Sequence, residues 1–207
     1  MGDWLLLVGA AIGLGSMALM LRRKNRFGKK SVASIASAVE GQVVRVRGEV
    51  AAAEPLEAPY TDRPCVYWEL EFRNSAVGNF TTLEASDRCD FELSDGTGLA
   101  RVHAGDCSFH VVRDPTEIEH MRDMSERAKK LVDRFDHRLA AVGQIEIYEG
   151  IIGIGDTVDV VGSGVREPLR APTHERERGY RDAPETALVF SGGTEVFAEE
   201  RESVYIG

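Results

Sequence analysis

Apolar and polar residues alternate along much of the chain after residue 40, with the period of two that is typical of a β-strand buried on one face. In residues 42–50, Val44, Val46 and Val50 alternate with polar or charged residues. Shorter segments of strand character follow and are separated by glycine-containing turns. They cover residues 88–93, 98–103, 108–112, 144–148, 157–161 and 187–191. The pattern predicts a mostly antiparallel, barrel-like sheet.

The strongest alternation lies in residues 65–73. The apolar side consists of Val66, Trp68, Leu70 and Phe72. The other side consists of Tyr67, Glu69, Glu71 and Arg73. Tyrosine and arginine are enriched at protein interfaces, so we expect this second side to be an exposed binding surface. Glu69 and Glu71 also have the spacing of paired carboxylates, but on a strand that spacing is typical of a solvated face.

A helical period replaces the alternation in residues 114–136. Asp114, Pro115 and Glu117 provide an N-cap, a proline in the first turn and an acid three residues after the cap. Apolar residues then recur at helical spacing, namely Ile118, Met121, Ala128, Leu131, Val132 and Phe135. The spacing predicts one long amphipathic helix packed on the sheet. The expected fold class is therefore α+β.

An uncharged run, residues 4–21, precedes all of these elements. As a helix it would reach about 27 Å, close to the ~30 Å hydrocarbon core of a bilayer. Six basic residues follow it directly: Arg22, Arg23, Lys24, Arg26, Lys29 and Lys30. Basic flanks favour the cytoplasmic side, and a flank behind the apolar run argues against a cleaved signal peptide. The pattern predicts an integral, single-span membrane protein with residues 1–30 as transmembrane anchor, the N-terminus outside and the main domain cytoplasmic.

Charge divides unevenly between the two predicted parts. Residues 1–30 contain one acid and six bases, so the formal net charge of -9 leaves an excess of acids on residues 31–207. An acidic domain argues against a nucleic-acid partner, whereas the basic flank suits a lipid bilayer. Gly9 and Gly13 form a small-xxx-small pattern that permits a weak homodimer through the predicted span. The expected partners are the bilayer and another membrane protein.

The remaining 177 residues are predicted to form one domain, 31–207, without a second boundary. Within it, residues 166–184 contain three prolines and a charged run. This composition predicts a long mobile loop. The three cysteines, Cys65, Cys89 and Cys107, form no close pair, which suits a reducing compartment.

Five short segments carry a resemblance to a known family. They are residues 46–50, 55–59, 63–68, 91–98 and 155–162. In order and spacing they resemble the GIDE family of membrane-anchored domains, best known from a mitochondrial ubiquitin ligase. The resemblance implies a small β-rich domain beside a membrane. The ligases of that family end in a zinc-binding RING, which needs eight Cys or His ligands in paired spacings, and this chain has three cysteines, five histidines and no C-x-x-C.

Candidate chemistry is sparse in the sequence. His103, Asp106, Cys107 and His110 lie close enough in the chain to hold a metal, but their spacing matches no closed zinc motif. Cys65 has no base nearby in sequence and reads as a packing residue. We expect no catalytic residue and no cofactor, and predict a binding or scaffolding module. Two alternatives stay open: a RING-less relative that serves a ubiquitin-like pathway, and an enzyme with an unrecognised metal or cysteine site.

Overall fold

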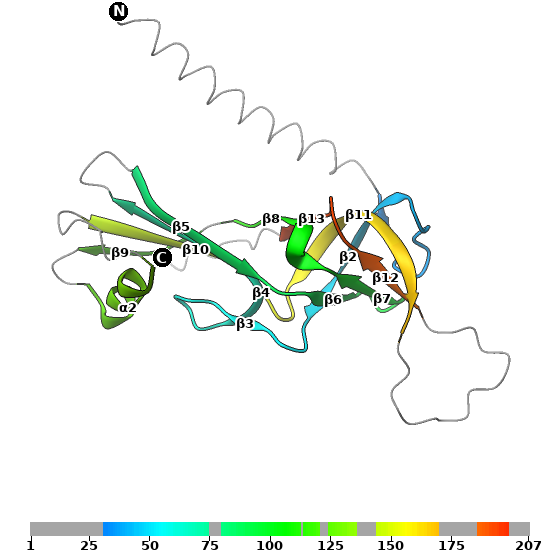
Figure 1. The fold of residues 1–207 in the computed structure, drawn as a ribbon, viewed down its shortest axis with the longest axis horizontal. Coiled ribbons are helices and arrows are strands. Elements are labelled where there is room, and N and C mark those ends of the chain that lie inside the picture. Colours follow the sequence, from blue (N-terminus) through cyan, green and yellow to red (C-terminus); the bar gives the residue numbers. More distant parts are fainter. Residues whose placement is uncertain are drawn as a thin grey trace, which may run out of the picture.

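A computed structural model describes residues 31–74, 80–112, 114–120, 124–135, 144–169 and 186–198. These residues form a barrel and a long arm that extends from it (Figure 1). The strands are β1 (Val32–Ala33), β2 (Val43–Ala51), β3 (Leu56–Glu57), β4 (Pro64–Asn74), β5 (Phe80–Arg88), β6 (Phe91–Ser94), β7 (Leu99–Val102), β8 (Ser108–His110), β9 (Asp114–His120), β10 (Gln144–Gly153), β11 (Thr157–Pro168), β12 (Thr186–Phe190) and β13 (Glu195–Ala198). The helices are a short 3-10 turn (Ala104–Asp106) and α2 (Glu126–Phe135).

The barrel is a ring of five strands. β2 pairs with β6, β6 with β7, β7 with β12, β12 with β11, and β11 again with β2. Only the pairing of β7 with β12 is parallel within this ring. In chain order the ring runs first, second, third, fifth, fourth, which is the closed Greek-key arrangement of the OB fold. β1 extends the sheet beside β2, and β13 followed by β8 extends it beside β11.

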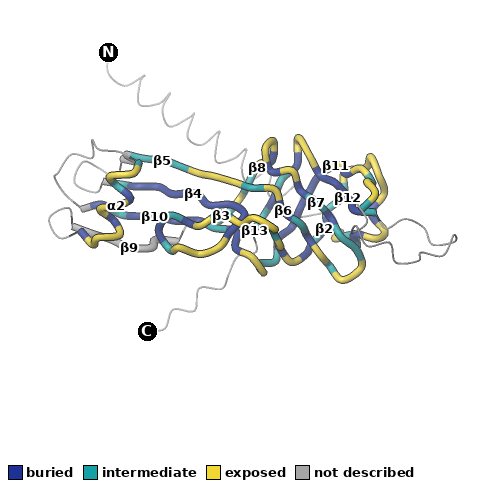
Figure 2. Tube along the Cα trace, turned by 60° about the horizontal axis from the view of Figure 1, so that its bottom comes forward, coloured by how far each residue is buried: buried dark blue, intermediate teal, exposed yellow. Residues whose placement is uncertain are grey.

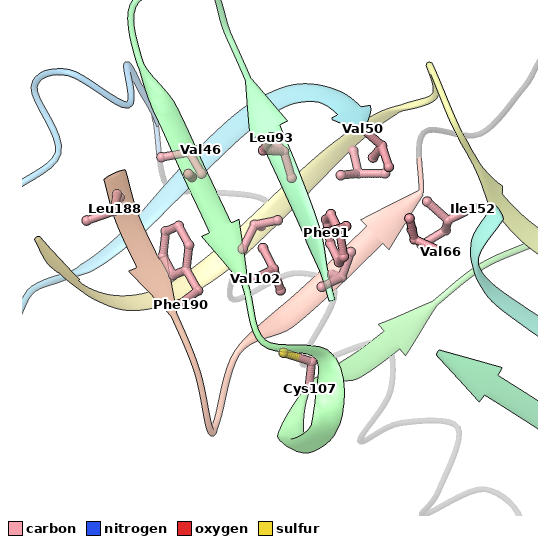
Figure 3. Packing of buried hydrophobic residues seen from close by; sticks show 14 of the residues in the cluster. Val46, Val50, Val66, Phe91, Leu93, Val102, Cys107, Ile152, Leu188 and Phe190 are labelled. Carbon is pink, nitrogen blue, oxygen red and sulfur yellow. The ribbon is translucent and has the colours of Figure 1, made fainter. Parts of the chain in front are cut away.

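The barrel encloses an apolar cluster (Figure 3). Its fully buried side chains include Val46, Val50, Leu93, Val102, Leu188 and Phe190. These residues come from four strands and alternate with outward-facing ones, so the period of two in the sequence places them inside. Val66 of β4 and Ile152 of β10 belong to the same cluster. The root of the arm is therefore part of the barrel core.

The arm is a five-stranded antiparallel sheet, in which β5, β4, β10 and β9 lie side by side in that order and the short β3 pairs with the start of β4. It is built from two insertions, one between β2 and β6 and one between β8 and β11. α2 lies against one face of this sheet (Figure 1). A second apolar cluster fills the contact and includes Trp68, Leu70, Phe72, Ile145, Ile147, Ala128 and Leu131. The apolar side predicted for residues 65–73 is thus confirmed.

The predicted helix over residues 114–136 is wrong in its first part. Asp114–His120 is the strand β9, and the helix begins only at Glu126 and ends at Phe135. Pairing with β10 overrides the local capping pattern, and Pro115 is tolerated because β9 has β10 as its only neighbour among the described strands. The actual N-cap is Ser125, whose Oγ accepts a hydrogen bond from the Ala128 N–H at 3.1 Å. The described fold is mostly β, not α+β.

Of the helices in the described ranges, none combines the length and the apolar character that crossing a bilayer requires. This finding contradicts the prediction of an integral, single-span membrane protein, which is not carried further. The predicted anchor, the small-residue pattern in it and the six basic residues at 22–30 lie outside the described residues. The predicted loop also needs correction, because residues 166–168 complete β11, while 170–184 lie outside the described residues.

Candidate functional site

The side of the arm sheet that points away from α2 gathers charged residues from three strands. Opposite residues of paired strands share a side, and Glu71 of β4 lies opposite both Glu84 of β5 and Tyr148 of β10. Arg73 lies opposite Glu146 in the same way. We call this side the polar face, defined by Glu69, Glu71, Arg73, Glu84, Glu146 and Tyr148. It contains three of the four residues predicted as an interface.

Arg73 is held in place at the centre of the polar face. Its Nε and Nη2 donate to the two carboxylate oxygens of Glu71 at 2.7 and 3.0 Å. Its guanidinium lies 4.3 Å from the ring centroid of Tyr148, a cation–π contact. The Tyr148 hydroxyl in turn donates to Glu146 at 2.8 Å. These hydrogen bonds raise the pKa of Arg73, and that of Tyr148, above their ordinary values.

The polar face carries four carboxylates. Glu71 is 3% exposed and is neutralised by Arg73, whereas Glu69, Glu84 and Glu146 are half-buried or exposed. Figure 2 shows how β4 is buried over most of its length, while much of β5 is exposed. The polar face is therefore acidic at its accessible positions. Two described arginines lie on this side of the sheet: Arg73 is bonded to Glu71 and stacked on Tyr148, and Arg88, opposite Tyr67, donates to the Cys107 carbonyl oxygen at 3.0 Å.

Tyr67 does not lie on an exposed surface, contrary to expectation. It is 7% exposed, and its ring stacks on Phe109 with a centroid distance of 4.3 Å. Its hydroxyl donates to Glu69 at 2.8 Å. β8 and the residues that follow it cross the root of the polar face, where Phe109 of β8 contacts Tyr67 and Val111 lies beside Gly150. Tyr67 is thus a residue of the junction between barrel and arm.

Gly150 permits this crossing. A Cβ at Gly150 would lie 2.6 Å from Cγ2 of Val111 and 3.2 Å from Cγ of Glu69. Real Cβ atoms do not approach other carbons so closely, so a side chain at this position would displace the crossing segment. A glycine inside a strand is a known sign that another part of the backbone comes close, and this signal was present in the sequence.

The candidate metal ligands are engaged separately. The Nδ1 of His103 lies 2.7 Å from Asp90, which also accepts from the Ala104 N–H at 2.8 Å. The ring of His110 stacks on Phe197 instead, with a centroid distance of 4.5 Å. Across the described residues, no group of three or more His, Cys, Asp or Glu side chains is arranged to hold a metal. The structure does not bring His103, Asp106, Cys107 and His110 together as one ligand set.

Two of the three thiols, those of Cys65 and Cys107, are buried. Burial raises the pKa of Cys65 to about 12 and that of Cys107 to about 11. The Cys107 thiol donates to the His103 carbonyl oxygen at 3.2 Å rather than to an imidazole nitrogen. A nucleophilic cysteine needs a thiolate near neutral pH, and burial favours the thiol. Cys65 and Cys107 are packing residues in this fold.

The sequence interpretation missed two buried carboxylates. Glu149 is 7% exposed and accepts from the Tyr60 N–H, the Thr61 N–H and the Thr61 hydroxyl at 2.7, 3.2 and 2.7 Å. Burial raises its pKa despite these bonds. The signal for it was present: Glu149 occupies an apolar position of the alternation that includes Ile145, Ile147 and Ile151. It fixes the loop that precedes β4.

Asp159 is the second buried carboxylate and lies on the outer surface of the barrel. It is 8% exposed and accepts from Arg45 at 2.7 Å and from Arg47 at 3.0 and 2.8 Å. Burial opposes its ionisation, but these hydrogen bonds and charges lower its pKa below the ordinary value. These ion pairs connect β2 to β11, and the pairing of these two strands closes the ring. Its role is structural.

The chain matches no family model, no curated protein and no solved structure. The resemblance to the GIDE family therefore rests on its five segments alone.

Proposed function

We propose that this chain is a binding module that recognises a lysine- and arginine-rich segment of another protein through the polar face of the arm. The observation that carries the proposal is the charge of that face: Glu69, Glu84 and Glu146 are accessible, and the two described arginines on that side of the sheet are engaged, Arg73 with Glu71 and Arg88 with the Cys107 carbonyl oxygen. Complementary charge steers partners and sets their register. A basic segment fits the face, and an acidic one is repelled.

The rigidity of the face supports the same proposal. A bidentate ion pair, a cation–π contact and a tyrosine hydrogen bond connect Glu71, Arg73, Tyr148 and Glu146 across two strands. A surface that is already ordered loses little conformational entropy when a partner binds. The buried thiols with raised pKa values favour a binding role over cysteine chemistry.

The test is a charge-neutralising triple variant, Glu69→Gln, Glu84→Gln and Glu146→Gln. A labelled twelve-residue peptide of alternating lysine and serine serves as the probe, and fluorescence anisotropy measures its Kd for the full chain. Each lost pair of opposite charges is worth about 0.5 kcal/mol, so we expect binding about tenfold weaker. Glutamine keeps the acceptor that Tyr67 uses on Glu69, which limits structural change.

The matched control removes three acids elsewhere: Glu54→Gln, Glu57→Gln and Glu167→Gln, all at exposed positions away from the polar face. The control has the same net charge as the triple variant, and we expect its Kd to stay within twofold of the unaltered chain. Equal weakening in both variants would show that overall acidity, and not the polar face, attracts the peptide, and the proposal would then fail.

A further inference from the structure

Residues 32–40, which we call the strap, lie against the barrel before its first strand. β1 pairs in parallel with β2 through Val32 and Ala33. The chain then turns, and Gly41 brings it into β2 with a positive φ of 74°. Ile35, in the middle of the strap, is fully buried in the barrel cluster. Ala38 belongs to the same cluster, so two residues of the strap are core residues, although the strap lies outside the ring of strands.

Side chains of the barrel contact the backbone of the strap on both its donors and its acceptors. Asp95 accepts from the Ile35 N–H at 2.8 Å, and the Thr97 hydroxyl oxygen accepts from the Ala36 N–H at 3.2 Å. Arg166 donates to the carbonyl oxygens of Ile35, Ala36 and Ala38. Burial would raise the pKa of Asp95, but its hydrogen bonds hold that pKa below the ordinary value. Three side chains therefore recognise five backbone groups of the strap.

The pocket for Ile35 is shaped to one side chain. A Cβ at Gly98 would lie 3.1 Å from Cγ2 of Ile35, so the glycine makes room for the branched aliphatic group. Strand addition for affinity, together with a pocket for a side chain, is a recurring way in which proteins recognise extended peptides. The strap binds the barrel as such a peptide would, but from within the same chain.

We propose that the surface formed by Asp95, Thr97, Gly98 and Arg166 is an exchangeable strap site, which the strap of a second copy of this chain can occupy in place of its own. Reciprocal exchange leaves every contact of the site intact and makes a closed dimer. Only the hinge at Gly41 must change conformation. Because each strap is covalently connected to its own barrel, it is present at its own site at a high effective concentration. A strap from a second copy competes with it only at high protein concentration, so the fraction of exchanged dimer increases with protein concentration.

The hinge provides the test. Gly41→Val puts a β-branched residue at a positive φ, which strains the hinge in the unexchanged chain. An extended hinge relieves this strain, and short strained hinges favour exchange. We expect sedimentation of the full chain to show a monomer–dimer constant at least tenfold tighter than that of the unaltered protein. Gly193→Val is the matched control, because Gly193 also has a positive φ, 77°, and also has open space around its Cβ. Its dimer constant should equal that of the unaltered protein.

A third variant identifies the contact. Ile35→Asp, added to Gly41→Val, places a charge in the apolar pocket and should abolish the tighter dimer. The proposal is overturned if Gly41→Val dimerises no more than Gly193→Val, or if its dimer persists with Ile35→Asp. Gly41→Ala strains the same φ less and should shift the constant in the same direction by a smaller factor, so the test stands if Gly41→Val does not fold.

Discussion

The barrel and the arm bury their carboxylates in different ways. The barrel places Asp159 on its outer surface between two arginines, and its interior is filled by side chains such as Phe190 and Leu188. The arm instead has Glu149 on the apolar side of its sheet and Glu71 on the other. The barrel therefore depends mainly on apolar packing, whereas the arm depends also on polar groups that must all find partners.

The two regions also differ in how far each depends on the other. The ring of five strands closes on itself, while the arm ends in β5 and β9, each with one neighbour among the described strands. Val66, Tyr67 and Ile152 at the root of the arm belong to the barrel cluster. Loss of the barrel core should thus disorder the arm, and loss of the arm core should spare the barrel.

The largest expected effect tests this one-way dependence. Phe190→Ala and Phe72→Ala each remove a fully buried ring, at a cost of about 3–5 kcal/mol in the free energy of unfolding. Hydrogen exchange of Phe190→Ala should show lost protection in both regions. Phe72→Ala should lose protection in β4, β5 and β10 beyond their roots, while β2, β7 and β11 keep theirs. Equal loss of protection in both variants would mean that barrel and arm are one cooperative unit.

Glu149→Ala tests the polar dependence of the arm. It leaves the buried Tyr60 N–H and the Thr61 N–H without their acceptor, which should cost about 2–3 kcal/mol. Glu57→Ala, at an exposed position nearby, should change the free energy of unfolding by less than about 0.5 kcal/mol. Urea titration of both variants measures the difference. A Glu149→Ala chain as stable as its control would remove the main contrast with the barrel.

Gly150→Ala tests the junction between the two regions. Its Cβ would collide with Val111, and overpacking of this kind costs about 1–2 kcal/mol. Adding Val111→Ala removes the colliding methyl group and should restore most of the lost free energy of unfolding. A double-mutant cycle measured by thermal unfolding would show this recovery. Additive losses in the double variant would mean that the crossing segment does not rest on the sheet at this point.

The smallest expected effect is a pair of opposite pH dependences. The pKa of Glu149 is raised in the folded chain, so its stabilising contribution is complete below the ordinary value of 4.5 and is lost as pH rises through the folded pKa. The pKa of Asp159 is lowered, so its contribution is complete above 3.8 and is lost as pH falls through the folded pKa.

Two conservative variants isolate these contributions. We compare the unfolding free energy of the unaltered chain with that of each variant between pH 3 and 7. Relative to Glu149→Gln, the stability of the unaltered chain should fall as pH rises. Relative to Asp159→Asn, it should rise with pH at the low end of this range. If both differences in unfolding free energy changed with pH in the same direction, they would contradict the assignment of a raised pKa to Glu149 and a lowered pKa to Asp159.

The sequence predicts the barrel strands better than the arm, for a physical reason. Val46 and Val50 alternate with charged residues because β2 has one buried face, and periodicity reports that directly. β5 was missed because its exposed side is polar and its segment carries few apolar residues. β9 was mistaken for helix because capping signals are local, whereas pairing with β10 is not.

The candidate site was found only in part for a similar reason. Alternation places Glu69, Glu71 and Arg73 on one side of β4, but it cannot show that the chain crosses the root of that side and buries Tyr67. Nor can it pair Arg73 with Tyr148, which lies on a strand far along the chain. The partners of a side chain across a sheet depend on register, and register is set by the whole fold.

The order of strands around the ring has a consequence for how the molecule is made. β2 pairs with β11, and their ion pair joins residues 112 positions apart in the chain. The last strand of the ring, β12, ends at Phe190. Contacts of such long range make folding slow. During synthesis, β2, β6 and β7 leave the ribosome with their apolar sides uncovered, and the ring can close only after β12 has emerged as well.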